Sequence, residues 1–503
     1  MIYEKKILSK TGYEIPLFKN GHPMFSKYNY KNEVEVFAQN LNSNFIIILG
    51  IGSGYHIECV SKKLPLAKII CIEADKESLE FSLTFKTSSE LSKNENIFFC
   101  SLENLNDYIK LYLPSIYGNL TISSYKTWEN ENPEISKKII YKIKTQLNVI
   151  ASDYSVQVHF GKIWNRNIFL NYKKISKSQF LKNQNTNLIA AIIAAGPSLD
   201  FSIKKLKDNR KSYFIISTDT SFNSLLNNEI FPDCVVSIDG QQISSTHFFK
   251  IVSPEKYKIH FVFDLCSNPE TVNRIINLEQ EIEFVKSNHP LENILQGTEN
   301  LLKLESGSGT VTIAACDWAR QNGFKKMEFF GADFSYTSKA YAKGTYLDYN
   351  FSSNQNLLEN LETKFLTLMF RTELEKINSN IFTQKFTENL YTSPTLKNYG
   401  ISLLDWAKKF DFSNQENIFK TQKNFNYQYS KISKIENINY EEEILKFKNN
   451  LQNLEQKNLN QLLQDKYFYS ILPLIAWLRE NHKECSSLQS FIKLAYKDCL
   501  RYN

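Results

Sequence analysis

Unbroken apolar runs that end in small or acidic polar residues recur in the middle of the chain. The first covers Leu188 to Ala195, and a run of this length bounded by a turn is typical of a strand buried on both faces. A Gly-Pro-Ser turn at 196–198 interrupts it, and the apolar spacing of Leu199 to Lys207 then predicts a helix. Such a turn offers backbone N–H groups to a phosphate, although an ordinary βα turn explains the same residues.

Two further apolar runs follow, each ending in acidic residues. Tyr213 to Ser217 precedes Thr218 and Asp219, and the run from Asp233 to Ile238 precedes Asp239. Ligands of open parallel sheets bind outside the carboxyl ends of the strands. We therefore expect these polar residues to lie near a ligand.

A glycine-rich loop and a fourth strand complete this pattern. The loop, Glu-Ser-Gly-Ser-Gly-Thr at 305–310, leads into a predicted helix from Val311 to Arg320, which Gly323 closes. Lys326 to Phe330 is then a strand that ends in Gly-Ala-Asp-Phe at 331–334. Strands that alternate with helices in this way predict a doubly wound parallel sheet over residues 188–400.

A second glycine turn lies near the N-terminus. Phe45 to Gly54 is a buried strand that runs into Gly50, Gly52 and Gly54, with a predicted helix from Tyr55 to Lys63 after it. The next strand ends in Glu-Ala-Asp at 73–75, and an acid about twenty residues after such glycines is the signature of a site for a dinucleotide or S-adenosylmethionine. A Rossmann-like domain whose turn is only structural is the alternative that we favour.

The remaining segments predict a chain of four parts. Short strands with a turn at Asn20-Gly21 belong to an N-terminal domain over 1–150, and a mostly helical stretch from Pro133 to Phe169 leads into a connector over 151–187. No glycine follows Gly400, and the apolar periodicity predicts an all-helical domain over 401–503.

Composition and charge exclude several classes of protein. The net charge of +7 is small for 503 residues and does not indicate nucleic-acid binding. No apolar run reaches membrane-spanning length, and the N-terminus lacks the apolar segment of a signal peptide. The eight cysteines form no metal-binding spacing, so we expect buried, reduced thiols in a cytoplasmic protein without membrane insertion.

Three motifs together resemble a known family. Ala-Gly-Pro-Ser-Leu-Asp (195–200), Ser-Gly-Ser-Gly-Thr-Val (306–311) and Gly-Ala-Asp-Phe (331–334) are similar to the central domain of the motility-associated-factor (Maf) flagellin glycosyltransferases. That domain is itself similar to bacterial sialyltransferases and to archaeal 6-hydroxymethylpterin diphosphokinase-like proteins. The order and spacing of the motifs carry the resemblance, which extends over roughly the whole chain.

The resemblance implies a reaction and a set of site residues. The reaction is transfer of a nonulosonic acid of the pseudaminic or legionaminic type from its CMP-activated form to Ser or Thr of flagellin, for flagellar assembly and motility. The helices of the C-terminal domain would then dock flagellin. The residues expected to bind the nucleotide sugar are Gly196, Pro197, Ser198, Thr218, Asp219, Ser306, Gly307, Thr310, Gly331 and Tyr341.

The resemblance does not assign the general base. The sialyltransferases place a histidine after the Gly-x-Asp motif, whereas this chain has none between His289 and His482. Asp239 and Asp333 are therefore the candidate catalytic residues. Asp219 and Asp239 lie where the relatives carry Asn, so either could instead be a ligand of a divalent metal ion. Four polar residues between Asp239 and the glycine loop at 305–310 are expected to be surface or core residues rather than ligands, namely His247, His260, Asp264 and His289.

Two further segments have assigned roles. The polar loop from Tyr336 to Tyr346 has the composition of a substrate lid. His159 and Trp164 precede the central domain, where Trp164 is more consistent with a packing anchor than with a cleft residue.

Two alternatives stay open. A pterin diphosphokinase-like enzyme needs clustered carboxylates that hold Mg²⁺ around ATP. Only one acid occurs in Ser-Ile-Asp-Gly-Gln at 237–241, which favours the transferase. A flagellin-binding chaperone with a vestigial cleft is the non-enzymatic alternative.

Overall fold

The structure is a computed structural model that describes residues 1–181, 187–250, 253, 255–307, 309–347, 360–378, 389–415, 417–423 and 438–502. The chain forms two compact units. Unit 1 consists of Met1–Gly161 together with Leu472–Phe491, and unit 2 of Lys162–Ile471 together with Ile492–Asn503. Both contain parallel sheets and helices, and the last part of the chain is helical, so the predicted α/β fold class is confirmed.

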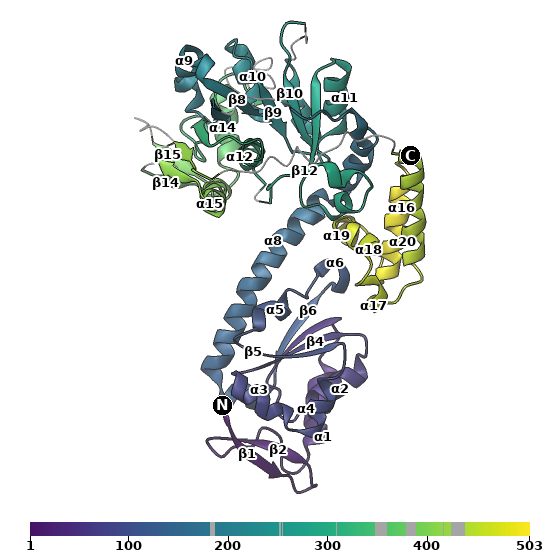
Figure 1. Cartoon of the computed structure of the whole chain (residues 1–503). Helices are drawn as coiled ribbons and strands as arrows, with labels where there is room; N and C mark the ends of the chain where they lie inside the picture. The colour runs from purple at the N-terminus through teal and green to yellow at the C-terminus, as the bar shows by residue number, and fades with distance from the viewer. Residues whose placement is uncertain are drawn as a thin grey trace. The chain divides into compact units, whose positions relative to one another are not determined.

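Unit 1 is built on a four-stranded parallel sheet in the order β5-β4-β3-β6, which Figure 1 shows in the purple part of the chain. The strands are β3 (Phe45–Leu49), β4 (Lys68–Glu73), β5 (Ile97–Ser101) and β6 (Leu120–Ser124). β3 is buried at every residue, as its unbroken apolar sequence predicts. The order reverses between β3 and β6, so the glycine turn after β3 lies at a switch point.

The helices of unit 1 begin near the predicted positions. The helix from Tyr55 to Lys63 is confirmed as α2. The long stretch that begins at Pro133 is confirmed as the helix α8 (Pro133–Tyr172), whose residues after Gly161 belong to unit 2. The other helices of this unit are α1 (Tyr30–Gln39), α3 (Lys76–Leu83), α4 (Lys86–Leu91), α5 (Leu105–Ile109), α6 (Pro114–Tyr117), α7 (Lys126–Glu131) and α19 (Leu472–Asn481).

The N-terminal hairpin turns at a different place from the predicted one. β1 (Tyr3–Leu8) pairs antiparallel with β2 (Glu14–Phe18), so the connecting turn is 9–13, where Gly12 has a φ of +80°. The predicted turn at Asn20-Gly21 does reverse the chain, but only into a single antiparallel bridge between Leu17 and Pro23. Two turn signals lie close together here, and the longer pairing forms around the first.

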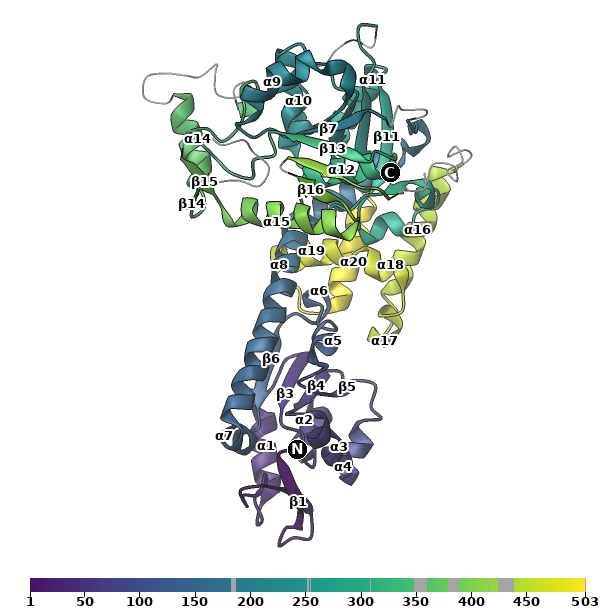
Figure 2. The same ribbon diagram turned by 60° about the vertical axis from the view of Figure 1, so that its left-hand side comes forward.

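Unit 2 contains a nine-stranded sheet in the order β12-β11-β10-β9-β8-β7-β13-β17-β16 (Figure 2). The seven strands from β12 to β13 are parallel, and β17 and β16 add antiparallel at one edge. The order reverses between β7 and β13, which is the switch point of a doubly wound sheet. The strands are β7 (Ile189–Ile193), β8 (Tyr213–Thr218), β9 (Cys234–Ser237), β10 (His260–Asp264), β11 (Glu281–Lys286), β12 (Leu302–Lys303), β13 (Lys326–Phe330), β16 (Ser413–Gln415) and β17 (Ile418–Lys420).

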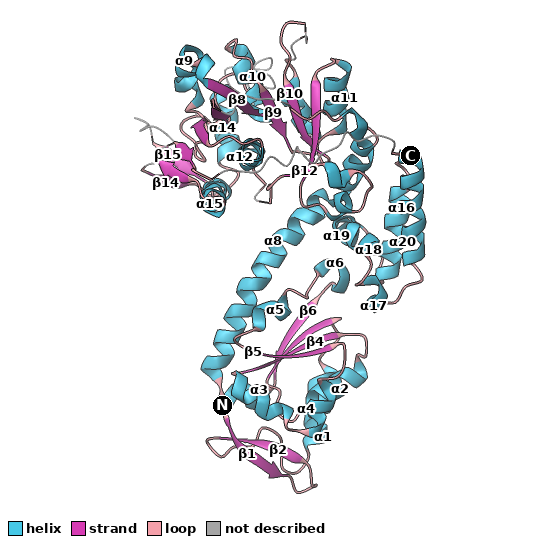
Figure 3. Ribbon diagram, viewed as in Figure 1, coloured by secondary structure: helices cyan, strands magenta, loops and turns pink. Residues whose placement is uncertain are grey.

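Helices cover both faces of this sheet, as Figure 3 shows by colour. Alternate residues of β7 point to opposite faces: Ala190 and Ile192 pack with Trp318 and Trp406 of α12 (Val311–Gln321) and α15 (Pro394–Lys409). Ala191 and Ile193 pack on the other face with α9 (Leu199–Asp208) and α10 (Asp219–Asn227). Smaller elements of this unit are η1 (Ile175–Lys177), η2 (Arg210–Ser212), η3 (Gln242–Phe248), α11 (Pro269–Asn277), η4 (Pro290–Asn293), η5 (Thr298–Asn300), α14 (Leu361–Met369), β14 (Glu375–Ile377) and β15 (Leu390–Thr392).

The C-terminal segment is helical from Tyr440 onward, as predicted, in α16 (Tyr440–Leu454), α17 (Leu459–Leu462), α18 (Lys466–Ser470), α19 and α20 (Leu488–Cys499). Residues 413–415 and 418–420 differ from the helical prediction for 401–503, because they form β16 and β17, which extend the large sheet. Phe419 of β17 is fully buried against Phe329 of β13, with ring centroids 4.7 Å apart.

The side-chain environments agree with the sequence in two respects. All eight cysteines are free thiols, of which Cys59 and Cys485 are half-buried and the other six buried. Within the described residues, no helix is both long and apolar enough to cross a membrane.

Candidate functional site

The switch point of unit 2 brings two turns into contact. The backbone N–H of Gly196, after β7, donates to the carbonyl of Gly331, after β13, at 2.8 Å. A Cβ on Gly196 would lie 2.5 Å from both that carbonyl oxygen and Oδ2 of Asp333. Gly331 has a φ of +66°, and a Cβ there would lie 2.3 Å from the carbonyl oxygen of Ala194. Both positions therefore require glycine because the strand ends approach so closely.

Asp333 is bonded to the start of helix α9. Its Oδ2 accepts the backbone N–H of Ser198 at 2.7 Å, and its Oδ1 accepts the Ser198 hydroxyl at 2.5 Å. Burial raises the pKa of this carboxyl to about 6. Phe334, the next residue, has a φ of +48°, an unfavourable conformation that recurs at functional sites. The N–H of the Gly-Pro-Ser turn thus already binds an anion supplied by the chain.

A cavity of about 240 Å³ opens beside these turns. It lies at the carboxyl ends of β7, β8 and β13, where a doubly wound sheet binds its ligands. We call it the switch-point cavity. It is lined by Ala194, Ala195, Gly196, Thr218, Thr220, Gly309, Thr310, Val311, Thr312, Gly331, Ala332, Asp333, Phe334, Ser335, Tyr336, Ala340, Tyr341, Leu396 and Tyr399.

The N-terminus of α12 forms one wall of the cavity. Thr310 is the N-cap residue, and Gly309, Thr310, Val311 and Thr312 all line the space. No acceptor among the described residues bonds the backbone N–H groups of Thr310, Val311 or Thr312. A helix start with available donors favours an anion, so this wall suits a phosphate or a carboxylate better than the occupied turn of α9 does.

Three tyrosines also line the cavity. Tyr336 and Tyr341 follow β13, and Tyr399 belongs to α15. The Tyr399 hydroxyl lies beside the glycine loop, because a Cβ on Gly309 would be 3.7 Å from it. Burial raises the pKa of all three phenols, so they stay protonated and can donate hydrogen bonds at neutral pH.

Six of the twelve residues predicted from the sequence line the cavity, namely Gly196, Thr218, Thr310, Gly331, Asp333 and Tyr341. Six do not, namely Pro197, Ser198, Asp219, Asp239, Ser306 and Gly307, although Ser198 is bonded to Asp333. Ser308 of the glycine loop lies outside the described residues. Sequence reasoning assigned no role at the site to Tyr399 or Thr312, although both line the cavity.

Asp219 and Asp239 follow β8 and β9 but serve local bonds. Asp219 is buried, with Oδ1 accepting the backbone N–H of Thr220 at 2.7 Å and Oδ2 accepting the Ser237 hydroxyl at 2.8 Å. Oδ1 of Asp239 accepts the backbone N–H of Gln241 at 2.9 Å, and burial, together with the charge of Asp219, raises its pKa. Since neither carboxylate lines the cavity, neither is placed there to bind a metal ion or to act as a base.

The segment from Tyr336 to Tyr346 is anchored along its length. Tyr336 exchanges two backbone hydrogen bonds with Tyr391, and the N–H of Ala342 donates to the carbonyl of Ala195 at 2.9 Å. The N–H of Lys343 donates to Asp200, and its carbonyl accepts from Ser224 at 2.6 Å. Opening this predicted lid would break all of these bonds.

Residues of α8 predicted to precede the site bind the other strand ends. Asn167 donates to the carbonyls of Gly240 and Cys266, both at 2.9 Å, and Asn171 donates to those of Leu265 and Ser267. Trp164 packs edge-on against His289 with ring centroids 5.8 Å apart. Its position is that of a packing residue, and neither His159 nor Trp164 lines the cavity.

The glycine turn of unit 1 is closed by its own acid. Oε1 of Glu73 accepts the backbone N–H groups of Ile51 and Gly52 and the Tyr3 hydroxyl, and Oε2 accepts the indole N–H of Trp128. Glu73 has no exposed surface. Glu73, the acid at the position that would hold the ribose of a nucleotide, therefore accepts the N–H groups of the glycine turn instead.

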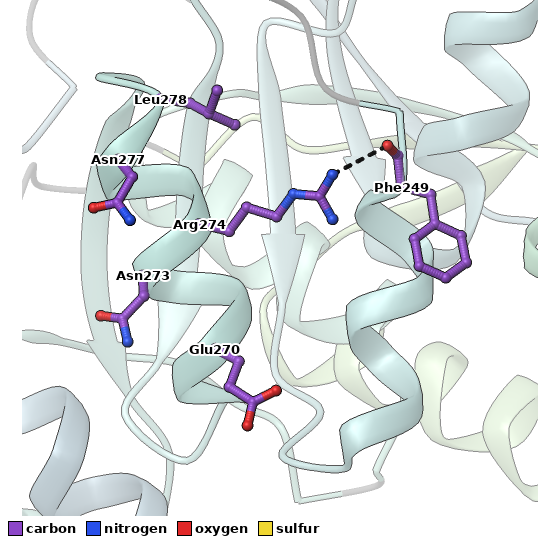
Figure 4. A pocket seen from close by; sticks show the side chains of 6 residues that line it. All are labelled: Phe249, Glu270, Asn273, Arg274, Asn277 and Leu278. Carbon is purple, nitrogen blue, oxygen red and sulfur yellow. Dashed lines mark hydrogen bonds between the residues drawn. The ribbon is translucent and has the colours of Figure 1, made fainter.

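A second hollow lies on the surface of unit 2 along α11, as Figure 4 shows. It measures about 590 Å³ and is wide open to solvent. Arg274, the cation at its centre, donates to the carbonyl of Phe249 at 3.3 Å, and Glu270 lies further along the same helix. Its lining residues are Phe249, Glu270, Asn273, Arg274, Asn277 and Leu278. They offer no buried acid or free helix start, so the switch-point cavity is the better candidate.

Residues 166–339 match the model of the 6-hydroxymethylpterin diphosphokinase MptE-like family. Two uncharacterized proteins of Treponema pallidum (strain Nichols) are similar to parts of the chain. One is 39% identical over 140 residues, which is 27% of this chain and 66% of the relative. The other is 37% identical over 119 residues, which is 24% of this chain and 42% of the relative. Neither match spans the whole of either protein.

The similarity to a solved structure extends much further. The structure of the Maf glycosyltransferase from Magnetospirillum magneticum AMB-1 superimposes with a TM-score of 0.54 at 12% sequence identity. The match covers 99% of this chain and 86% of the other. The resemblance inferred from the three motifs is thus confirmed at the level of architecture, and nearly the whole of this chain has the fold of a Maf glycosyltransferase.

Proposed function

We propose that this chain transfers a nonulosonic acid of the pseudaminic or legionaminic type from its CMP-activated form to Ser or Thr of flagellin. One observation carries the proposal: the switch-point cavity combines the open N-terminus of α12 with Asp333, a buried carboxyl whose pKa is about 6. The shared fold with a Maf glycosyltransferase supports the same chemistry.

The two features of the cavity divide the work of the reaction. The acceptor oxygen bonds to the anomeric carbon, the bond from that carbon to the CMP phosphate breaks, and CMP leaves with the electron pair. The N–H groups of Thr310, Val311 and Thr312 stabilise the negative charge that grows on the phosphate. Asp333 in its ionised form takes the proton of the acceptor hydroxyl. The tyrosines donate hydrogen bonds to the sugar.

The size of the cavity limits how much of the donor it holds. Its volume of about 240 Å³ is below the roughly 300–1,000 Å³ of most ligand pockets. The proposal therefore places only the phosphate and the anomeric centre inside it, and the cytosine base beyond its rim.

The family-model match keeps a second function in view. A pterin diphosphokinase-like enzyme transfers a diphosphate from ATP and requires carboxylates around Mg²⁺. Asp333 is the one carboxylate among the residues that line the described cavity, because Asp219 and Asp239 do not reach it. A single carboxylate favours the transferase. The closed turn at Glu73 likewise argues against S-adenosylmethionine as a ligand of unit 1.

Ligand binding by the full chain separates these functions. CMP should stabilise the purified protein against heat more than ATP with Mg²⁺ or S-adenosylmethionine does. Flagellin incubated with the protein and its CMP-activated sugar should then gain the mass of one or more nonulosonic acids. Preference for ATP with Mg²⁺ would favour the kinase. Flagellin binding with no response to any nucleotide would favour the chaperone.

The acceptor contact is predicted on the C-terminal helices, and a point variant tests it better than a deletion. Removing the chain from Tyr440 would strip α19 from unit 1, where Arg479 donates to the carbonyls of Ser115 and Ile116. Leu445 on α16 is 59% exposed, so Leu445→Glu should weaken capture of flagellin without loss of folding. Leu66→Glu, at a position in unit 1 that is 78% exposed, is the matched control.

A further inference from the structure

Three metal-ligating side chains meet at the carboxyl end of β10, outside the switch-point cavity. Asp264 is the last residue of β10, Cys266 follows the strand, and Glu292 lies in η4. One carboxylate oxygen from each acid and the Cys266 Sγ all lie within 4.8 Å of one another. The three residues are 1%, 3% and 0% exposed, respectively. The cluster is thus buried and is assembled from two separate segments.

The hydrogen bonds of the cluster leave one oxygen without a donor. Oδ1 of Asp264 accepts the backbone N–H of Cys266 at 2.7 Å, whereas its Oδ2 is buried and has no hydrogen-bond partner. Oε2 of Glu292 accepts from the N–H and hydroxyl of Ser287, and Oε1 accepts the Cys266 thiol at 3.7 Å. The carboxyl groups of Asp264 and Glu292 are also within hydrogen-bond reach of each other, so a proton or a metal ion can lie between them.

Within the described residues, no lysine, arginine or histidine forms an ion pair with Asp264 or Glu292. Lys286 interacts electrostatically with Glu292 at longer range but is not at ion-pair distance from it. Two adjacent buried carboxyl groups cannot both stay ionised without a positive charge, which must come from a proton or a metal ion.

The donor set indicates which metal ion would fit. Mg²⁺ and Ca²⁺ select oxygen ligands and do not favour a thiolate, whereas Zn²⁺ accepts both cysteine sulfur and carboxylate oxygen. Ligand atoms around one tetrahedral Zn²⁺ lie about 3.5 Å apart. Small side-chain rotations would therefore bring together three atoms that already lie within 4.8 Å.

We propose that Asp264, Cys266 and Glu292 bind a Zn²⁺ ion, with water as the fourth ligand. On binding, the metal replaces the thiol proton and the carboxyl proton that the acids otherwise retain, and both are released to solvent. The backbone of the site is fixed in advance, because Asn167 and Asn171 hold the carbonyls of residues 265–267. The ion joins the end of β10 to η4 and stabilises the fold. It takes no part in the proposed transfer reaction, since none of the three residues lines the switch-point cavity.

Cobalt alone is a suitable probe, because Co²⁺ occupies zinc sites and reports a thiolate ligand through its near-ultraviolet charge-transfer absorption. The full, untagged chain, stripped with a chelator and shown to be folded by circular dichroism, should bind one equivalent of Co²⁺. The charge-transfer band and the visible bands of a four-coordinate ion should appear together, and added Zn²⁺ should abolish both. The protein as purified should contain close to one equivalent of zinc by elemental mass spectrometry.

Matched variants assign the band to this site. Cys266→Ala should lose the charge-transfer band, while Cys234→Ala, which removes another buried thiol of unit 2, should keep it. Glu292→Gln has nearly the same shape and should weaken Co²⁺ binding at least tenfold. A folded wild-type chain with no band and no retained metal would overturn the proposal and leave a shared proton as the counter-charge. A band that persists in folded Cys266→Ala, or unchanged binding in Glu292→Gln, would overturn it as well. None of these results depends on a sugar donor.

Discussion

In each unit, an acidic side chain accepts backbone N–H groups of a turn at the switch point of a parallel sheet. The two acids differ in their surroundings. In unit 1, Glu73 at the end of β4 binds the N–H groups of Ile51 and Gly52. In unit 2, Asp333 after β13 binds the N–H of Ser198. Each acid occupies the place that an anionic ligand takes in a nucleotide-binding sheet.

The surroundings decide what each turn can do. Glu73 is enclosed by Tyr3, Ser82 and Trp128, all of which donate to it. A Cβ on Gly50 would lie 2.5 Å from Trp128, so no space remains for a ligand on that side of the turn. Asp333 borders a cavity that also contains the open start of α12. A glycine turn with a nearby acid therefore indicates an anion site whose occupant can be the protein itself.

The largest effect should follow from removing the enclosed acid. Glu73→Ala removes the acceptor of six buried donors, which should destabilise unit 1 by about 3–5 kcal/mol. Hydrogen exchange across residues 1–161 and urea unfolding measure this loss. Glu80→Ala, with a side chain that is 65% exposed, should change stability by less than about 0.5 kcal/mol. Equal stability of the two variants would mean that Glu73 does not hold the turn together.

The corresponding change in unit 2 should affect activity more than folding. Asp333→Asn retains an oxygen that accepts the N–H of Ser198 but cannot take a proton, so sugar transfer should fall by about a hundredfold or more. CMP binding should change little, because the N-terminus of α12 is intact. Asp405→Asn, on an exposed side chain of α15, is the control. Transfer at the control rate by Asp333→Asn would remove Asp333 from the chemistry.

Two glycine substitutions compare a closely packed position, Gly196, with an open one, Gly307. Gly196→Ala places a methyl group 2.5 Å from Asp333 and from the Gly331 carbonyl, which should cost about 1–3 kcal/mol. Gly307→Ala meets nothing within 4 Å and should be nearly neutral in thermal unfolding. If both variants unfold at the same temperature, the turn is less tightly packed than its geometry indicates.

The strands that build the cavity could be predicted because local sequence determines them. The run before Gly196 is apolar throughout, and the predicted bounds of Lys326–Phe330 agree with β13. β17 could not be predicted, since it has three residues and depends on pairing with β13 across almost a hundred residues of sequence. Its formation is a property of the assembled sheet.

The site could be predicted only in part, for reasons of strand order. Asp239 was a good candidate as an acid at the end of a buried strand, but β9 lies two strands from the switch point, which only the assembled sheet reveals. Tyr399 reaches the cavity from α15, and only the packing of that helix beside the glycine loop reveals that its hydroxyl lies at the site. The local sequence around Glu73 cannot distinguish an acid that binds a ribose from one that binds the N–H groups of its own turn. Tyr3 and Trp128, which are distant in sequence, enclose Glu73 and donate hydrogen bonds to it, which the local sequence does not reveal.

The smallest effect on activity should appear in its dependence on pH, and stability should respond with the opposite sign. Burial raises the pKa of Asp333 from its ordinary value of 3.8 to about 6. If the ionised form is the base, kcat/KM should fall about tenfold between pH 7 and pH 5. Because the pKa is higher in the folded protein, the protonated carboxyl stabilises the fold below pH 4. That contribution is lost as the pH rises through 6.

The difference in unfolding free energy between wild type and Asp333→Asn isolates this group, because the other buried acids, Glu73 included, are common to both proteins. The difference should change in favour of the variant by up to about 3 kcal/mol as the pH rises from 4 to 7. The variant should also lose the inflection near pH 6 from whatever transfer activity remains. An inflection that persists in the variant would assign the titration to another group, and Asp333 would then be as structural as Glu73.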